Sequence, residues 1–371
     1  MASIKTYIKT TIDTKDTMYE NMRENSAPLN ERKNSLDELC NKLDDKPLNK
    51  PLNKPLDKLY DGLCDHHFHL HFLPEARRKQ FCKETKISVW AVTVLPKQVD
   101  TKSKHSCVKE GLGFHPWELC KRLAASSADT KQELRHAYED FEEAFSAKLN
   151  EDKFDKNIPS EDTANKTLTD GNADDSSADD KNLANEKRIL IGEIGLDFTT
   201  SYQCFAQEQI KLLSFIFKTI KQSDKRFVLS LHARKSSGQV LELLAAQKLL
   251  IPRVPRNIGS LEQENQQVNY IFHWFSDSSQ ELYEVRKAGA YFSIGHRMLA
   301  SKKGRSYAQS IESDSLLLET DDPASLEADN YSAKIHNERM LLTLEKISEL
   351  RNNSPDLLKE HILSNQAKLM A

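Results

Sequence analysis

Short apolar runs alternate with helical patterns along most of the chain, and this alternation constrains the fold more than any other feature. Eight runs are expected to be strands: 63–68, 89–95, 111–114, 189–194, 227–231, 270–272, 290–293 and 316–318. The intervals hold helix-like segments at 206–222, 238–247 and 279–288. Because strands that alternate with helices favour a parallel sheet, eight such units predict a TIM (β/α)8 barrel. A doubly wound open sheet is the alternative.

Polar stretches interrupt this pattern. Residues 1–60 contain the tandem KPLNKPLNKPLDKL, in which proline recurs every fourth residue and disfavours helix. We interpret 1–60 as an N-terminal extension with a semi-rigid linker, and 61–371 as the barrel domain. Within that domain, residues 148–187 are acidic and small, which predicts a disordered insertion. A smaller polar excursion is expected at 252–268.

Composition excludes several classes of protein. No apolar run approaches the roughly 18–20 residues that a membrane span needs, so no membrane partner is expected. The amino terminus lacks the apolar centre of a secretory signal. Six cysteines without a CxxC pair indicate reduced thiols and a cytoplasmic protein. A net charge of −3 over 371 residues argues against a nonspecific polyanion coat but allows a local basic patch.

Histidine and acidic residues fall at the carboxyl ends of the expected strands, where barrel enzymes build their active sites. They are His67 and His69 (first strand), Glu193 (fourth), His232 (fifth), His273 (sixth) and Asp321 (eighth). His67 and His69 point the same way because they are two residues apart in a strand. Asp65, two residues earlier, is expected to face inward and orient a ligand.

This set of side chains suits a metal centre. Four imidazoles and two carboxylates fit Zn²⁺, Mn²⁺ or a mixed two-metal site. A carboxylate such as Glu193 can bridge two ions about 3.5–4 Å apart. Each residue alone has a plainer interpretation, either as a satisfied core histidine or as a helix cap. Their joint placement favours the metal centre.

The motifs around these residues resemble those of the TatD-like metal-dependent hydrolases, often called TatD DNases. The resemblance runs from about residue 61 to about residue 350. The matching pieces, in family order, are DHHFHL at 65–70, GFHPW at 113–117, GEIGLDF at 192–198, LHARK at 231–235, HWFS at 273–276 and ETDDP at 319–323. The family's usual HCFSG reads HWFSD here, which retains the histidine. Because Asp and Gly tolerate different backbone angles, the conformation of the following loop can differ, and this departure puts the substrate choice in doubt.

The resemblance implies a TIM barrel with a binuclear site and assigns a role to each residue. His67, His69 and Asp321 would bind one divalent ion, His232 and His273 a second, and Glu193 both. A hydroxide between the ions would attack the substrate, with Asp321 accepting a proton. Family members hydrolyse phosphodiesters in DNA, commonly as exonucleases, and some act on esters such as those of aminoacyl-tRNA. Mg²⁺ often supports their activity, and Zn²⁺ has been found bound.

Substrate contacts are predicted around the same mouth. Arg234 matches the family's HxR motif and could contact a phosphate, whereas His115 in GFHPW could line the pocket. The loop at 295–306 is the best candidate for gripping a nucleic-acid backbone, through Arg297, Lys302 and Lys303. The plainer interpretations are a salt bridge at the rim for Arg234 and a solvated helix end for the loop.

Three hypotheses follow for function. The first is a two-metal hydrolase of phosphodiesters, specifically a TatD-type 3'-5' DNA exonuclease with Glu193 and Asp321 catalytic. The second keeps the Mg²⁺, Zn²⁺ or Mn²⁺ ions but takes an ester or amide, for example as an aminoacyl-tRNA deacylase. The third adds a scaffold role, in which 1–60 or 148–187 recruits a protein partner. A basic rim favours a phosphate substrate, and a closed apolar pocket would favour a small neutral one.

Overall fold

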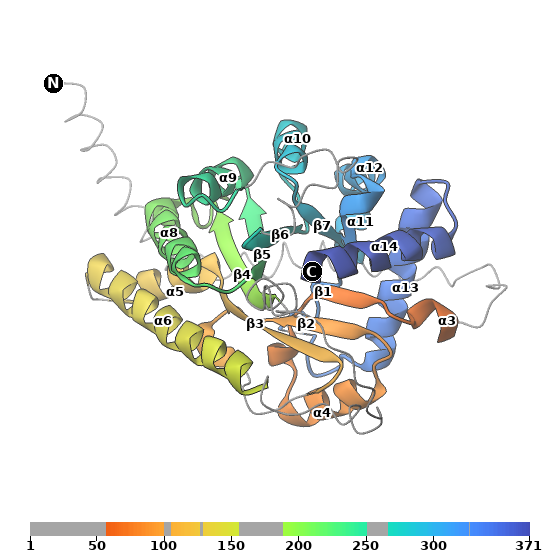
Figure 1. The fold of residues 1–371 in the computed structure, drawn as a ribbon, viewed down its shortest axis with the longest axis horizontal. Coiled ribbons are helices and arrows are strands. Elements are labelled where there is room, and N and C mark those ends of the chain that lie inside the picture. The colour runs from red at the N-terminus through yellow and green to blue at the C-terminus, as the bar shows by residue number, and fades with distance from the viewer. Residues whose placement is uncertain (1–56, 100–104, 127–128, 156–187, 251–265, 326) are drawn as a thin grey trace, which may run out of the picture.

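All eight predicted strands form, and they pair in chain order as one parallel sheet (Figure 1). Phe68 and Asp322 make a parallel bridge between the two ends of the sheet, so the sheet curls into a nearly closed barrel. The TIM (β/α)8 prediction is confirmed, and the open sheet is excluded. The strands are β1 (Cys64–Phe68), β2 (Ser88–Val92), β3 (Val108–Phe114), β4 (Ile189–Asp197), β5 (Phe227–Arg234), β6 (Val268–His273), β7 (Tyr291–Ile294) and β8 (Leu316–Leu318).

This computed structural model describes residues 57–99, 105–126, 129–155, 188–250, 266–325 and 327–371. Most of the predicted N-terminal extension and of the insertion at 148–187 therefore lies outside the described residues, as does 251–265. The described part of that insertion is the end of a helix that runs to Asp155. The partner-recruiting role of these segments stays a prediction. No helix in the described part of the chain could cross a bilayer.

Helices surround the barrel in Figure 1. The predicted helix at 206–222 has the observed bounds. The helix predicted at 279–288 ends one residue earlier, and the helix predicted at 238–247 begins and ends one residue earlier. The helices are α3 (Asp57–Tyr60), α4 (Glu75–Glu84), α5 (Pro116–Ala125), α6 (Thr130–Asp155), α8 (Ala206–Gln222), α9 (Ser237–Ala246), α10 (Ser279–Lys287), α11 (His296–Ala300), α12 (Lys302–Ser310), α13 (Ala333–Leu350) and α14 (Pro355–Met370).

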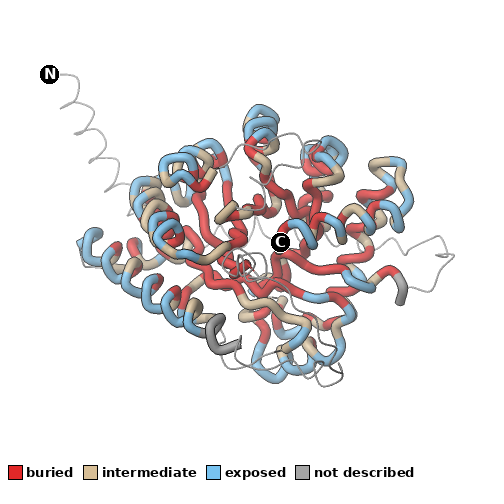
Figure 2. Tube along the Cα trace, viewed as in Figure 1, coloured by how far each residue is buried: buried red, intermediate tan, exposed pale blue. Residues whose placement is uncertain are grey.

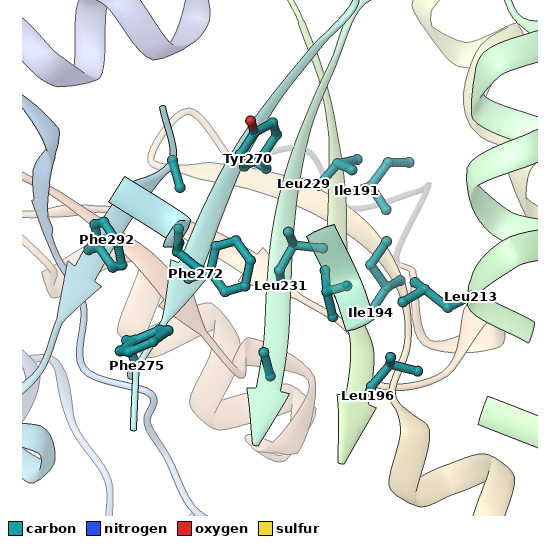
Figure 3. Close-up of a cluster of buried hydrophobic side chains, with 14 of the residues drawn as sticks. Ile191, Ile194, Leu196, Leu213, Leu229, Leu231, Tyr270, Phe272, Phe275 and Phe292 are labelled. Atoms are coloured by element: carbon teal, nitrogen blue, oxygen red, sulfur yellow. The ribbon is translucent and has the colours of Figure 1, made fainter. Parts of the chain in front are cut away.

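The main core lies between the strands and the surrounding helices. Alternate residues of β4 and β5, such as Ile191, Leu229 and Leu231, point outward and pack near Leu213 of α8 (Figure 3). Because side chains alternate across a strand, Ser230 and His232 point into the barrel instead. Figure 2 shows buried strands enclosed by helices whose outer faces are exposed. The same alternation thus builds the core and directs polar side chains inward.

A smaller apolar layer closes the amino end of the barrel. Residues from the beginnings of the strands, including Trp90, Leu190 and Val228, pack with Leu369 from the last turn of α14. The Arg188 Nε group donates to the Ala371 carbonyl at 2.7 Å, which anchors this turn to the start of β4. Figure 1 shows the C-terminus over the middle of the barrel. Polar chemistry is therefore left to the opposite, carboxyl end.

Candidate metal centre

Glu193 lies at the middle of the carboxyl mouth, with imidazoles on both sides of its carboxylate. The Oε2 atom is 3.5 Å from His67 Nε2 and 3.6 Å from His69 Nε2. The Oε1 atom is 3.0 Å from His273 Nε2 and 3.1 Å from His232 Nδ1. All five residues are buried. The structure thus brings together side chains from β1, β4, β5 and β6, as the sequence predicts.

Asp321 completes the group on the β1 side. Its Oδ1 atom lies 3.0 Å from His69 Nε2 and 3.5 Å from His67 Nε2. Asp321 has a φ of 57°, a region that residues other than glycine seldom occupy. Its backbone N–H donates to the His67 carbonyl at 2.9 Å, which holds the residue against β1. The strained backbone therefore aims this carboxylate at the two imidazoles.

The hydrogen bonds of two imidazoles fix which nitrogen carries the proton. His69 Nδ1 lies 3.3 Å from the Val92 carbonyl, which can only accept. The neutral ring therefore turns the Nε2 lone pair toward Asp321 and Glu193. His232 Nε2 lies 3.2 Å from an Asp197 carboxylate oxygen, so its Nδ1 lone pair faces Glu193. Lone pairs that face carboxylate oxygens require a cation between them.

Divalent metal ions fit this requirement. Two ligands that are each about 2.1 Å from one ion lie roughly 3–3.5 Å apart, which is the spacing seen here. His67, His69 and Glu193 form one group that could hold an ion, and His115, Glu193 and His232 form another. When no metal is bound, a proton takes the place: burial would lower the pKa of His232, but its hydrogen bond to Asp197 and the nearby Glu193 raise it to about 9.

His67 and His273 stack face to face, with ring centroids 3.8 Å apart. Burial lowers the pKa of His67 to about 3, so this ring is neutral. Its Nδ1 atom is 2.8 Å from the Ser230 hydroxyl oxygen, and its buried Nε2 has no hydrogen-bond partner among the described residues. An imidazole nitrogen without a partner beside a carboxylate is available to a metal ion.

Both predicted catalytic carboxylates are anionic. Burial would raise the pKa of Glu193, but His115, His67 and His273 outweigh it and hold the pKa well below its ordinary value. Burial would likewise raise the pKa of Asp321, but in the metal-free protein a protonated His69 donates to it, and this hydrogen bond and the charges of the nearby histidines lower the pKa. The site thus concentrates negative charge where ligand lone pairs converge.

His115 is oriented differently from the other histidines. The backbone N–H of Trp117 donates to its Nδ1 at 3.0 Å, so a neutral ring carries its proton on Nε2. That Nε2 lies 3.0 Å from Glu193 Oε1. Burial lowers the pKa of His115, which keeps the ring neutral. His115 therefore donates a hydrogen bond into the site, in keeping with its predicted place in the pocket.

Sequence reasoning missed Asp197, which supports the site from behind. Its Oδ2 atom accepts from Trp117 Nε1 at 2.7 Å and from His232, and Oδ1 accepts from the Thr199 backbone at 2.8 Å. Burial would raise the pKa of Asp197, but its hydrogen bonds, that from His232 first, lower it. The GEIGLDF motif contains this residue, so its place at the end of β4 was the available signal.

Glu319 and Asp65 are two further buried acids near the mouth. Glu319 accepts from the Trp274 backbone at 3.0 Å and bonds the Ser293 hydroxyl, and burial raises its pKa well above its ordinary value. Asp65 does not orient a ligand ring as expected. It accepts from the His67 backbone at 3.0 Å and bonds the Thr320 hydroxyl. The register of β1 shifts between Asp65 and Phe68, which breaks the expected alternation.

The predicted substrate-binding cations are spread around the rim. Arg234 is 49% exposed and lies 3.9 Å from Asp197. Arg297 is turned away from solvent, with ion pairs to Asp322 at 2.8 Å and to Glu327 at 3.1 Å. Lys303 donates to the Ser276 carbonyl at 2.8 Å, and Lys302 is exposed at the start of α12. The structure does not bring these four cations together.

Two further histidines near the mouth were not predicted as site residues. His71 continues the spacing of His67 and His69, and its ring centroid is 5.4 Å from that of His69. Neither of its buried nitrogens has a hydrogen-bond partner in the described ranges. His296 begins α11, and burial lowers its pKa to about 4. The spacing of two was the signal for His71, and none marked His296.

Most of the chain is similar to a known protein family. The family model described as "TatD related DNase" matches residues 64–371. The mouse protein "Putative deoxyribonuclease TATDN3" is 26% identical over 140 residues, which cover 38% of this chain and 42% of that protein. The chain thus matches less than half the length of this curated relative.

Solved structures show the same architecture. A yeast protein from Saccharomyces cerevisiae, named an uncharacterized amidohydrolase, has a TM-score of 0.55 at 12% identity, covering 83% of this chain and 99% of its own. A hydrolase TatD family protein from Entamoeba histolytica has a TM-score of 0.52 at 11% identity, covering 83% and 97%. At these identities the likeness concerns the fold alone.

Proposed function

The chain belongs to the TatD-related DNase family, and from that premise we propose that it is a metal-dependent hydrolase of phosphodiester bonds in DNA. The observation that carries the proposal is the position of Glu193. Each of its two carboxylate oxygens faces a different set of imidazoles, and Oε1 also lies 3.0 Å from His115. One carboxylate shared between two sets of nitrogen ligands is the arrangement that a pair of divalent ions requires.

The proposed ligands divide into two sets around Glu193. His67, His69 and Asp321 hold one ion, and His232 and His273 hold the other; the ions are Mg²⁺, Zn²⁺ or Mn²⁺. Bound ions supply a Lewis acid for the phosphate and acidify an attacking water. The neutral state of His67 and the orientation of the His69 and His232 lone pairs support this assignment.

The side chains of this protein then have distinct tasks. The Asp321 carboxylate is anionic and 16% exposed, so it can accept the proton of the attacking water. The His115 Nε2–H points into the site and can donate to a substrate oxygen. Asp197 keeps His232 in the tautomer that offers its Nδ1 lone pair. Arg234 at the rim can meet an adjacent phosphate.

The substrate is proposed to be a DNA strand, degraded from its 3' end. The family description and the exposed cations Arg234 and Lys302 support a polyanion. Five cysteines among the described residues carry reduced thiols, which supports a cytoplasmic location.

The test uses the full chain, stripped of metal and reloaded with Mg²⁺, Mn²⁺ or Zn²⁺. Single-stranded DNA labelled at the 5' end should shorten to a ladder, whereas a 3' label should be released as a mononucleotide. RNA, aminoacyl-tRNA and a panel of carboxyl esters are run beside it. Turnover of an ester with intact DNA under all three metals would replace the DNase proposal with the ester hydrolase. Glu193→Gln serves as the inactive control in every arm.

A further inference from the structure

Cys82 and Cys107 lie against each other outside the metal centre. Cys82 is in the last turn of α4, and Cys107 directly precedes β3. The Cys107 Sγ atom donates to the Cys82 carbonyl oxygen at 3.6 Å. Since a carbonyl oxygen is about 2.4 Å from its own Cα, this sulfur lies within about 6 Å of the Cys82 Cα. This separation is compatible with the distances that a disulfide spans.

The backbone on both sides fixes this contact. The Cys107 carbonyl accepts from the Val89 backbone at 2.8 Å, which ties it to β2. Cys82 packs with Val108 against the apolar cluster that contains Phe68 and Phe81. The packing of α4 on the barrel therefore brings the two cysteines together.

The pair differs from the other described cysteines in chemistry. The Cys82 thiol donates to the Cys107 sulfur, which lowers the pKa of Cys107 to about 7 and raises that of Cys82. Burial raises the pKa of Cys64 and Cys120 instead. Because the thiolate is the nucleophile, Cys107 is the reactive sulfur at neutral pH. Both members of the pair are half-buried, so a small oxidant can approach.

We propose that Cys82 and Cys107 form an oxidisable pair that takes a low-molecular-weight disulfide as its substrate. The Cys107 thiolate attacks one sulfur of that disulfide, whose S–S bond breaks and releases one thiolate. Cys82 then loses its proton to water, attacks the Cys107 sulfur and displaces the second thiolate. Two protein thiols are oxidised to one disulfide, and the small disulfide is reduced to two thiols.

The probe is oxidised glutathione, added to the full chain with its metals at neutral pH. After alkylation of the remaining thiols, intact mass should show the loss of two hydrogens without a retained adduct. Peptide mapping without reduction should join the segment of Cys82 to that of Cys107. A persistent glutathione adduct on the wild type, or a bond to any other cysteine, would overturn the proposal.

Variants assign the order of the two steps. Cys82→Ser should accumulate a glutathione adduct on Cys107, and Cys107→Ser should give neither adduct nor bond. Cys204→Ser, at a half-buried cysteine on another side of the barrel, should behave as the wild type. In protein that retains Cys82, alkylation of Cys107 should reach half its maximal rate near pH 7, because half of the Cys107 side chains are thiolates when the pH equals the Cys107 pKa. A midpoint near 9, the ordinary value, would contradict the assigned nucleophile.

Discussion

Asp321 and Asp322 are neighbours in the chain, and they face opposite kinds of surroundings. Asp321 meets the imidazoles of His67 and His69. Asp322 meets two guanidinium groups, that of Arg297 at 2.8 Å and that of Arg339 at 2.9 Å. We call Asp322, Arg297, Arg339 and Tyr331 the Asp322 cluster; Tyr331 donates its hydroxyl to Asp322 at 3.1 Å.

The difference separates a site that needs a ligand from one that does not. Guanidinium groups are charged at every accessible pH, so the Asp322 cluster satisfies its own carboxylate. Imidazoles whose lone pairs point at a carboxylate leave that carboxylate unsatisfied until a cation arrives. Burial differs only modestly between them, because the Asp321 side chain is 16% exposed and that of Asp322 is fully buried. What distinguishes the two sites is whether the partners of the carboxylate donate protons to it: guanidinium groups do, and imidazole lone pairs do not.

The largest effect is expected at the shared carboxylate. Glu193→Gln keeps the volume of the side chain but removes the charge that both sets of imidazoles face. DNA cleavage should fall by about 10³-fold or more, and bound metal should be lost. Cleavage of labelled DNA and elemental analysis measure the two effects. Glu327→Gln, at an acid that is 37% exposed beside the Asp322 cluster, is the matched control. If E193Q kept the wild-type metal content, the contrast between a metal centre that needs a cation and the Asp322 cluster would not hold.

Asp322→Asn should act on stability instead. It leaves two largely buried guanidinium groups with only the partly exposed Glu327 as a carboxylate partner, which should cost about 3 kcal/mol in the free energy of unfolding. Urea denaturation of the metal-free protein measures this. Glu327→Gln should cost less than about 1 kcal/mol, because that carboxylate is partly exposed. An Asp322→Asn protein as stable as the wild type would show that the cluster does not support itself.

Asp197→Asn tests a residue that positions a metal ligand, rather than a metal ligand itself. The variant should bind metal about 10- to 100-fold more weakly, because His232 loses the carboxylate that fixes its tautomer. Competition with a chelator measures the affinity. An unchanged affinity would mean that the orientation of His232 does not depend on Asp197.

The smallest effect is expected at the rim. Lys302→Ala should raise KM for DNA two- to threefold and lower the salt dependence of binding by about one counterion. Arg297→Met should instead reduce stability, since Arg297 belongs to the Asp322 cluster. If Arg297→Met changes the salt dependence and leaves stability intact, Arg297 grips the substrate as its sequence position first indicated.

Periodicity was sufficient to predict the barrel and the convergence of its polar residues. Strand ends of a parallel barrel meet at one mouth, so His232 and His273 could be placed without coordinates. What failed was local register. The shift in β1 turned Asp65 to the backbone, although a spacing of two pointed it inward.

Ion-pair and thiol partners that come from distant segments could not be predicted from the sequence either. Arg297 looked like a free cation because its partners Asp322 and Glu327 come from later segments of the chain. Cys82 and Cys107 meet only through the packing of α4. Such contacts depend on the angle at which a helix docks, which no pattern in the chain encodes locally.

The last turn of α14 limits how a ligand can enter and leave the barrel. Leu369 and its neighbours form a floor under the barrel, and barrel interiors are filled by side chains. A molecule that enters at the carboxyl mouth must therefore leave through the same opening. If the chain cleaves a polymer as proposed, that polymer could not pass through the barrel, and its shortened end would have to enter the mouth again after each cleavage.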